Sequence, residues 1–228
     1  DYAGGTTGPD GTCDDITGSV SIAISDDTLP DFATAENELV IEDGDGATNP
    51  VKWTGSGNVA VMTAAPNATM VEFHNRILWL AGRTDARSRL DFSNLDDIDT
   101  YTSTDFILVE TDDGQVITSL KSALDCLYIF KTESIWRICG SDRDNLVLEQ
   151  MVRGVGAANN NYIVFINNQF VFQTTQGNFA VYDGGITVQI ISGKIQGTLS
   201  DLAQDRLDNT GAVAFDDGTG DQDYYVSL

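Results

Sequence analysis

Histidine and cysteine are scarce in this sequence: its 228 residues include a single histidine, His74, and three cysteines. A metal site built on several histidines is therefore excluded, and a Ser–His–acid triad would have to use this one imidazole. The sequence also lacks a Gly-x-Ser-x-Gly turn, a glycine-rich phosphate loop and a Cys-x-x-Cys pair. It shows no catalytic residues, so we expect a non-enzymatic protein in which His74 has a structural role beside a neighbouring loop.

Basic residues and long apolar runs are also few. Acidic residues outnumber basic ones by 35 to 12, for a formal net charge of −23. Such a surface repels phosphate backbones, which argues against tight nucleic-acid binding. No apolar run approaches the ~18–20 residues that cross a bilayer, so we expect no membrane association. The simplest interpretation of the acidity is a solvated surface with aspartates in turns. Calcium loops, a salty habitat or a channel wall along which DNA slides are the alternatives.

Two acidic, glycine-rich segments place oxygen ligands at alternate positions, as calcium loops do. The first contains Asp43 and Asp45, and the second contains Asp217 and Asp221. Neither segment is followed by the glutamate that ends an EF-hand calcium loop. We therefore expect turns, keep these four aspartates as weak calcium candidates, and expect no other metal or cofactor.

The cysteines allow two interpretations. If Thr132 and Glu133 form a hairpin tip, Cys126 lies directly opposite Cys139, with Cβ atoms about 4.5–5.5 Å apart, which is close enough to consider a disulfide. Two buried, reduced thiols are the favoured interpretation, because nothing in the sequence indicates an oxidising compartment. Cys13 has no evident partner.

Strand-like patterns repeat along the chain. Five times, an apolar run is followed by a turn and a second apolar run, near residues 38–54, 76–94, 115–140, 162–184 and 212–228. The separations are 38, 50, 43 and 43 residues, measured between Val40, Leu78, Tyr128, Val171 and Ala214. A strand repeat of about 40–50 residues is typical of β-propeller blades. We therefore predict an all-β protein, a β-propeller with about five visible blades in a complete or incomplete ring. A two-sheet β-sandwich is the alternative.

The predicted propeller occupies residues 19–228, after an irregular, flexible segment at residues 1–18 that is rich in glycine and threonine. Alternation of Val20, Ile22 and Ile24 predicts a half-buried strand over residues 19–25. Helix is scarce, with one candidate over residues 195–207. Both ends of the chain look cut, so we expect a fragment of a longer protein.

The second strand pair contains motifs that resemble those of a known protein family. The sequence there contains Pro66-Asn-Ala, then His74-Asn-Arg-Ile-Leu-Trp-Leu-Ala-Gly82, then Leu90-Asp-Phe-Ser93. This order resembles the β-propeller tail proteins of short-tailed bacteriophages, of the tail tubular B (nozzle) or tail-stabilisation type. Later segments are similar to the same family in the same order, so the resemblance covers about residues 38–228; these segments are residues 115–140, 152–156, 176–184 and 191–195.

The resemblance implies a structural component of the virion, without catalytic residues. It also implies partners among other phage tail subunits and a homo-oligomeric ring or tube around the DNA exit channel. The family proteins are usually longer, with further domains outside the propeller. A channel wall of like charge would lower the friction on exiting DNA, which gives the net charge a physical rationale.

Two other functions stay open. A secreted carbohydrate-binding propeller or adhesin would stack Trp53, Trp79 or Trp136 on sugar rings. We expect Trp79 and Trp136 in the core, because both lie within apolar strand patterns. The turns near Asp43, Thr132 and Gln176 share no set of aromatic and polar residues, which argues against a lectin and for blades with different turn chemistry. A propeller hydrolase with unidentified carboxylates is the least favoured alternative.

Overall fold

The computed structural model describes residues 15–22, 28–195, 197, 211–216 and 222–226. The protein is all-β, with four four-stranded antiparallel sheets and one two-stranded sheet. Sheet I comprises β1 (Asp31–Ala35), β2 (Glu38–Glu42), β3 (Val51–Trp53) and β4 (Ala60–Val61). Sheet II comprises β5 (Met70–His74), β6 (Ile77–Ala81), β7 (Arg89–Phe92) and β8 (Phe106–Leu108).

The second half of the chain continues the pattern. Sheet III comprises β9 (Ile117–Ala123), β10 (Cys126–Lys131), β11 (Ser134–Cys139) and β12 (Val147–Arg153). Sheet IV comprises β13 (Val164–Ile166), β14 (Gln169–Gln173), β15 (Phe179–Tyr182) and β16 (Gln189–Ile190). Sheet V pairs β17 (Ala212–Asp216) with β18 (Gln222–Val226). Two short 3-10 helices, η1 (Asn160–Tyr162) and η2 (Ser192–Lys194), confirm that helix is scarce in the described part.

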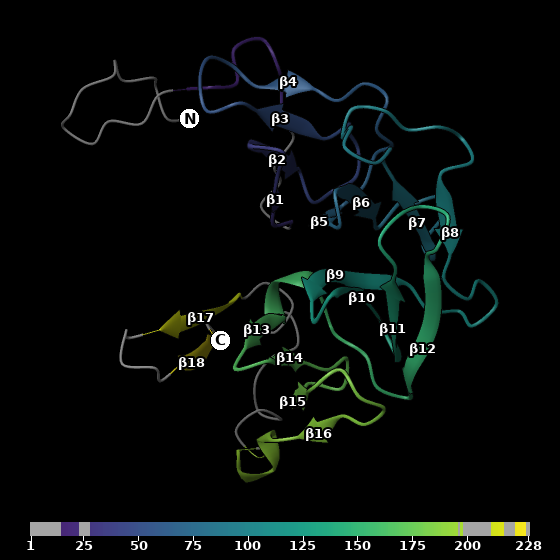
Figure 1. The fold of residues 1–228 in the computed structure, drawn as a ribbon. Helices are drawn as coiled ribbons and strands as arrows, with labels where there is room; N and C mark the ends of the chain where they lie inside the picture. Colours follow the sequence, from purple (N-terminus) through teal and green to yellow (C-terminus); the bar gives the residue numbers. More distant parts are fainter. Residues whose placement is uncertain (1–14, 23–27, 196, 198–210, 217–221, 227–228) are drawn as a thin grey trace.

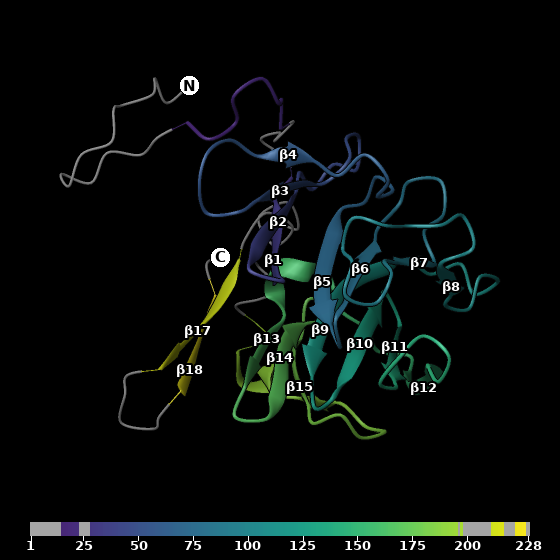
Figure 2. The same cartoon turned by 45° about the horizontal axis from the view of Figure 1, so that its top comes forward.

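The sheets follow one another around an arc. In Figure 1 the first strands of sheets I to IV (β1, β5, β9 and β13) lie on its inner side, and the last strands (β4, β8, β12 and β16) lie on its outer side. The turned view in Figure 2 shows sheet V at the end of the arc, beside β13 of sheet IV. The described residues do not form a closed ring of sheets.

All five expected strand pairs are antiparallel neighbours, as their apolar runs predicted: β2–β3, β6–β7, β10–β11, β14–β15 and β17–β18. The hairpin register is also confirmed, because Cys126 pairs with Cys139 and Tyr128 with Arg137. Strands β6 and β10 are buried at every position. A strand buried on both faces lies between two layers, so each of these sheets packs against a neighbour on either side.

One turn is shared by sheets I to IV, and it is a different turn from those near Asp43, Thr132 and Gln176, for which we expected different turn chemistry. Two residues join the first strand to the second in each sheet, and all eight have φ between 49 and 68°. They are Glu36-Asn37, Asn75-Arg76, Leu124-Asp125 and Asn167-Asn168. Two consecutive left-handed residues match the right-handed twist of a hairpin, and asparagine and aspartate tolerate that conformation best. The signal was present in the sequence, in a turn that the apolar pattern did not single out.

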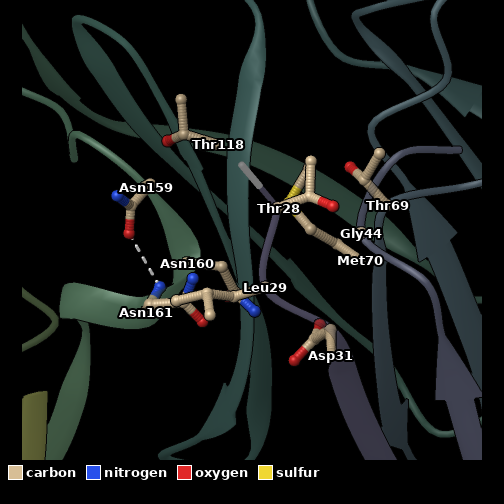
Figure 3. Close-up of a pocket in the computed structure, with 10 residues that line it drawn as sticks. All are labelled: Thr28, Leu29, Asp31, Gly44, Thr69, Met70, Thr118, Asn159, Asn160 and Asn161. Carbon is tan, nitrogen blue, oxygen red and sulfur yellow. Dashed lines mark hydrogen bonds between the residues drawn. The ribbon is translucent and has the colours of Figure 1, made fainter. Parts of the chain in front are cut away.

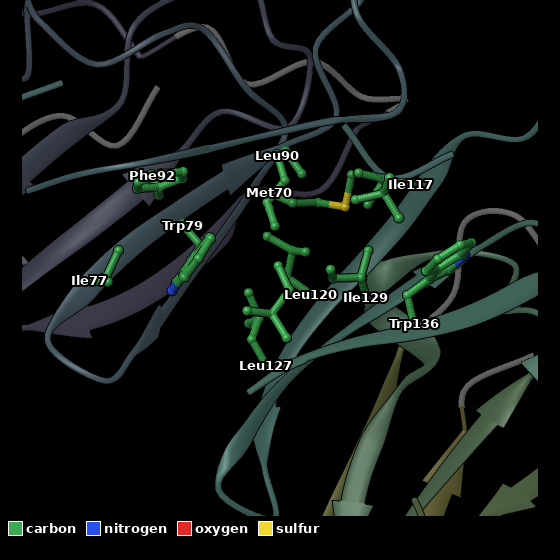
Figure 4. Packing of buried hydrophobic residues seen from close by; sticks show 13 residues of the cluster. Met70, Ile77, Trp79, Leu90, Phe92, Ile117, Leu120, Leu127, Ile129 and Trp136 are labelled. Atoms are coloured by element: carbon green, nitrogen blue, oxygen red, sulfur yellow. The ribbon is translucent and has the colours of Figure 1, made fainter. Parts of the chain in front are cut away.

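The core lies between neighbouring sheets. In the interface of sheets II and III, Trp79 packs 5.2 Å from Phe92, measured between ring centroids, and faces aliphatic side chains of β9 and β10 (Figure 4). An aromatic cluster around Tyr128 and Phe170 fills the interface of sheets III and IV. Smaller side chains, among them Ala33, Ala35 and Val40, fill the interface of sheets I and II.

The strand predicted over residues 19–25 is not formed in its described part. Residues 19–22 form no strand, and Val20 and Ile22 instead lie as an irregular segment against Ile41 and Val51 of sheet I. Their apolar spacing reflects contact with a sheet face rather than a place in a ladder. Other predictions concern residues that lie outside the described part of the chain. These are residues 1–14 and 23–27, the predicted helix over residues 195–207 except for 195 and 197, and the calcium candidates Asp217 and Asp221.

Candidate functional site

A polar pocket opens where the inner strands of the arc begin. Its volume is about 210 Å³. The lining comes from the starts of β1, β5 and β9, the loops beside β1 and β2, and η1, which leads into sheet IV (Figure 3). The lining residues are Thr28, Leu29, Asp31, Gly44, Thr69, Met70, Thr118, Asn159, Asn160 and Asn161. We call this the axial pocket, because sheets I to III and η1 converge on it.

Asp31 is the one carboxyl group that the described residues contribute to the lining of the axial pocket. Its Oδ2 accepts the backbone N–H of Val71 at 2.9 Å, and the Asn160 side chain is a further hydrogen-bond partner. Burial raises the pKa of Asp31, and the nearby ammonium group of Lys121 opposes that shift. Ser119 Oγ donates to Asn160 Oδ1 at 2.5 Å, so the carboxyl and the carboxamide are both held in place.

Three further polar side chains of the lining are oriented by hydrogen bonds to backbone groups. Asn159 Oδ1 accepts the N–H of Asn161 at 2.9 Å and caps η1, as the dashed line in Figure 3 shows. Thr118 Oγ1 donates to Phe130 O at 3.3 Å, and Thr69 Oγ1 donates to Gly82 O at 3.4 Å. A hydroxyl that donates one bond keeps its lone pairs as acceptors. The pocket wall is therefore ordered and still able to accept hydrogen bonds.

Glu42 and Glu72, two further carboxyl groups on the first two sheets, have raised pKa values. Glu42, opposite Asp31 in the register, is fully buried, and neither of its oxygens has a hydrogen-bond partner within the described residues. Burial, with smaller contributions from Asp43 and Asp31, raises the pKa of Glu42 to about 10. Burial raises the pKa of Glu72 to about 7, against the opposing influence of Lys121. Glu42 therefore holds its proton at neutral pH.

The calcium candidates in sheet I serve a turn. Asp43 Oδ1 accepts the backbone N–H groups of Asp45 and Gly46 at 3.2 and 3.1 Å, and its Oδ2 accepts the Thr48 hydroxyl at 2.5 Å. Asp45 Oδ1 accepts the N–H of Ala47 at 2.7 Å. These bonds form Asx-type turns and occupy the oxygens that a cation would need. In the described part of the chain, no three histidine, cysteine or acidic side chains gather as a metal site would require.

His74 is buried at the end of β5. Its Nδ1 lies 2.8 Å from Ser122 Oγ on β9, so its partner belongs to a strand and not to the loop that we expected. Its Nε2 has no partner within the described residues, and burial lowers the pKa of the imidazole. A triad needs a carboxylate on one ring nitrogen and the nucleophile on the other. This arrangement does not provide that relay.

Cys126 and Cys139 form a disulfide, so the expectation of two reduced thiols is wrong. Their Cα atoms are 4.6 Å apart at a directly opposed position of β10 and β11. Such a short separation is typical of the narrow, non-hydrogen-bonded pairs of an antiparallel ladder. The hairpin register thus holds the two sulfur atoms together, which is a stronger determinant here than compartment.

Lys131, which belongs to the family-like motif, is fully buried. Its ammonium group donates to the carbonyl oxygens of Val109 and Glu110 and to Asp113 Oδ2, each at 2.7 Å. It therefore ties the connection between sheets II and III to strand β10. Asn75, from the other motif, donates through its Nδ2 to Gly140 O at 2.6 Å and so links the turn of sheet II to sheet III.

The tryptophans lie largely as expected. Trp79 and Trp136 are core residues with 0% and 8% exposure. Trp53 is half-buried, and its Nε1 donates to Gly57 O at 2.9 Å. None of the three lines the axial pocket. No pocket residue was predicted from the sequence. Asp31, Thr69 and Thr118 lie at or next to the first residues of β1, β5 and β9, but no shared motif marks them.

No protein-family model matches the sequence, and no curated protein matches it. Among solved structures, the chain is similar to the extracellular domain of the hybrid two-component system BT4673 from B. thetaiotaomicron. That similarity has a TM-score of 0.50 and 9% identity, and covers 71% of this chain and 22% of that one. The chain thus spans about a fifth of that domain's length, and the likeness concerns the fold alone.

Two computationally designed proteins are also similar in part. Ika4 matches with a TM-score of 0.43 and 15% identity, over 71% of this chain and 96% of that one. Ika8 matches with a TM-score of 0.37 and 12% identity, over 72% of this chain and 61% of that one. Separately, among the described residues there is no helix with the length and apolarity to cross a membrane.

Proposed function

We propose that this chain is a non-enzymatic structural subunit of a bacteriophage tail, built as a β-propeller whose ring surrounds the DNA exit channel. The observation that carries the proposal is the place of the family-like motifs. Asn75 bridges sheet II to sheet III, and Lys131 ties the connection between these sheets to β10. Motif residues that hold consecutive sheets together are what a scaffold requires, whereas an enzyme's motif would converge on a reactive site.

The propeller part of the proposal is supported by the arc. The four-stranded sheets repeat the same strand order, with first strands inside and last strands outside (Figure 1). Strands buried on both faces and apolar interfaces between successive sheets are the packing that radial blades provide. A β-sandwich would instead pair two sheets over one core.

Sheet V offers a surface for assembly. On one face, Tyr224 donates its hydroxyl to Tyr162 O at 3.0 Å, and its ring contacts Phe179 of sheet IV at 6.1 Å between centroids. On the opposite face, Val213, Phe215 and Tyr225 are 60%, 53% and 54% exposed. Neighbouring sheets elsewhere in the arc bury such a face. Contact with another sheet, in ring closure or with a neighbouring tail subunit, would bury it here.

The proposal is tested on particles and on the purified chain. Mass spectrometry of purified tailed-phage virions should detect this sequence, and native mass spectrometry of the chain should show discrete homo-oligomers. A gel-shift assay at moderate salt should show no tight DNA binding, because the net charge is −23. Absence from virions whose genome encodes the chain would overturn the assignment, whatever the oligomeric state.

A further inference from the structure

The axial pocket is small and is built by residues of sheets I to III and of η1. Its volume is about 210 Å³, below the roughly 300–1,000 Å³ of pockets for drug-sized ligands. A water molecule occupies about 30 Å³ in the liquid, so the space suits several waters or one small ligand. Since the lining residues come from positions as distant as Asp31 and Asn161, the pocket exists only in the folded arc.

The lining disfavours charged and apolar ligands. Among the described residues, no lysine, arginine or histidine lines the pocket. The ammonium group of Lys121 lies near Asp31 but is not part of the lining, so an anion in the pocket would face the Asp31 carboxyl with no cation in the wall. Calcium takes about six to eight oxygen ligands, usually from several carboxylates. Among the described lining residues there is one carboxyl, and the carboxamide oxygens of Asn159 and Asn160 already accept hydrogen bonds. An apolar ligand would cover the Asn and Thr groups without bonding them, which costs free energy.

We infer that the axial pocket binds a neutral, hydroxyl-rich small molecule of the size of a single sugar ring. This inference does not depend on the tail assignment, because it rests on the pocket alone.

The lining of the axial pocket offers both the acceptors and the donor that the hydroxyl groups of such a ligand need. A sugar hydroxyl both donates and accepts, so it needs acceptors and donors close together. The hydroxyl groups of Thr69 and Thr118 each donate their proton to a backbone carbonyl, so toward the pocket their oxygens act as hydrogen-bond acceptors. Asp31 adds a carboxyl acceptor, and the carboxamide of Asn161 supplies both a donor and an acceptor. Met70 supplies an apolar surface for the C–H face of a ring.

The experiment is isothermal titration calorimetry with ligand-observed NMR, using glucose, galactose, mannose, fucose, xylose and N-acetylglucosamine as probes. Two variants address the site: Asn161→Ala removes one carboxamide, and Asn161→Phe fills the volume. Asn178→Ala is the matched control, because Asn178 does not line the pocket. Circular dichroism and the unfolding midpoint establish that each variant is folded.

We expect at least one sugar to bind the original chain and the Asn178→Ala control equally. Asn161→Ala should weaken that binding about tenfold, as the loss of one or two hydrogen bonds predicts, and Asn161→Phe should abolish it. If the phenylalanine variant does not fold, shifts of the Thr118 and Met70 signals on titrating the original chain locate the ligand. The inference is overturned if folded protein binds none of the sugars or if binding survives Asn161→Phe. It is likewise overturned if the pocket signals respond to calcium chloride or sodium phosphate in place of the sugars.

Discussion

Lys131 and Glu42 are both fully buried ionisable residues, but their surroundings differ completely. Lys131, beside the connection between sheets II and III, gives its ammonium group three oxygen acceptors, one of them a carboxylate. Glu42 shares a strand face with Val40, in the interface of sheets I and II, and has no partner among the described residues. Nearby Tyr101 also has a hydroxyl without a partner in that set. The region around Lys131 accommodates a buried charge by pairing it, whereas the region around Glu42 avoids a buried charge by keeping the carboxyl group protonated.

The difference shows where the fold tolerates disturbance. A paired buried charge is costly to break, because the partner is left uncompensated, while an unpaired neutral acid is already a cost that substitution can remove. Sheet III, which holds Lys131 and the disulfide, should therefore be the sensitive region. Sheet I, which holds Glu42, should be open to improvement.

The largest expected effect is at Lys131. Lys131→Met leaves the Asp113 carboxylate and two carbonyl oxygens without their donor, and should lower the free energy of unfolding by about 3–5 kcal/mol in urea titrations. Arg76→Met is the control, because its pair with Asp96 lies at an exposed turn, where solvent screens the two charges and the pair stabilises the fold little. Adding Asp113→Leu to Lys131→Met should recover part of the loss. Equal effects of Lys131→Met and Arg76→Met would remove the contrast between buried and exposed pairing.

The disulfide is the next test of sheet III. Cys126 and Cys139 are 13 residues apart in sequence, and closing a loop of this length stabilises a chain by about 2–3 kcal/mol. The double variant Cys126→Ser/Cys139→Ser should therefore lose about that much in denaturant unfolding. The original chain in excess reductant should approach the same value. A double variant as stable as the oxidised chain would show that the hairpin register alone holds this end of the sheet.

Substitution of Glu42 should stabilise the chain, whereas substitution of Lys131 or of the disulfide should destabilise it. The pKa of Glu42 rises from its usual 4.5 to about 10 in the folded chain, so between these values the folded form holds a proton that the unfolded form has released. Stability therefore falls as the pH rises through this window, by at most about 1.4 kcal/mol per pH unit. Glu42→Gln, which cannot ionise, should be more stable than the original chain by about 1–3 kcal/mol at pH 8.

The comparison of Glu42→Gln with the original chain is made by urea unfolding from pH 5 to pH 9. The gap between the two should widen with pH, whereas Glu133→Gln, on the exposed tip of the β10–β11 hairpin, should run parallel to the original. A constant gap across the range would mean that Glu42 ionises in the folded chain as it does in the unfolded one.

The smallest effect concerns the shared turn. Leu124 has φ of 50°, a left-handed conformation that costs a branched residue more than asparagine. Leu124→Asn, which copies the turn of sheet IV, should raise the unfolding free energy by about 0.3–1 kcal/mol. The reverse change, Asn167→Leu, should lower it by a similar amount. If both variants destabilise, the contact of the Leu124 side chain with the region of Gly184 outweighs the backbone term.

The apolar patterns predicted the five strand pairs, because the two strands of each pair follow one another in the sequence. Their pairing is therefore determined by residues close together in the chain. Apolar alternation failed over residues 19–22, where the same spacing lets an irregular segment cover Ile41 and Val51. The register of Cys126 and Cys139 followed from one turn, but the compartment argument then favoured the wrong redox state. The axial pocket could not be predicted, since Asp31, Thr118 and Asn161 carry no motif and meet only after sheets I to III and η1 have packed together.

The four left-handed turns and the axial pocket lie at opposite ends of the same inner strands: the pocket is where these strands begin, and the turns are where they end. One rim of the arc is therefore lined by hydroxyls, carboxamides and a carboxyl, and the other by tight backbone reversals whose side chains differ from sheet to sheet. An assembly built from this wall has a direction along its axis. Subunits stacked in it must meet either like rim to like rim or unlike to unlike, and these two modes of stacking differ in chemistry.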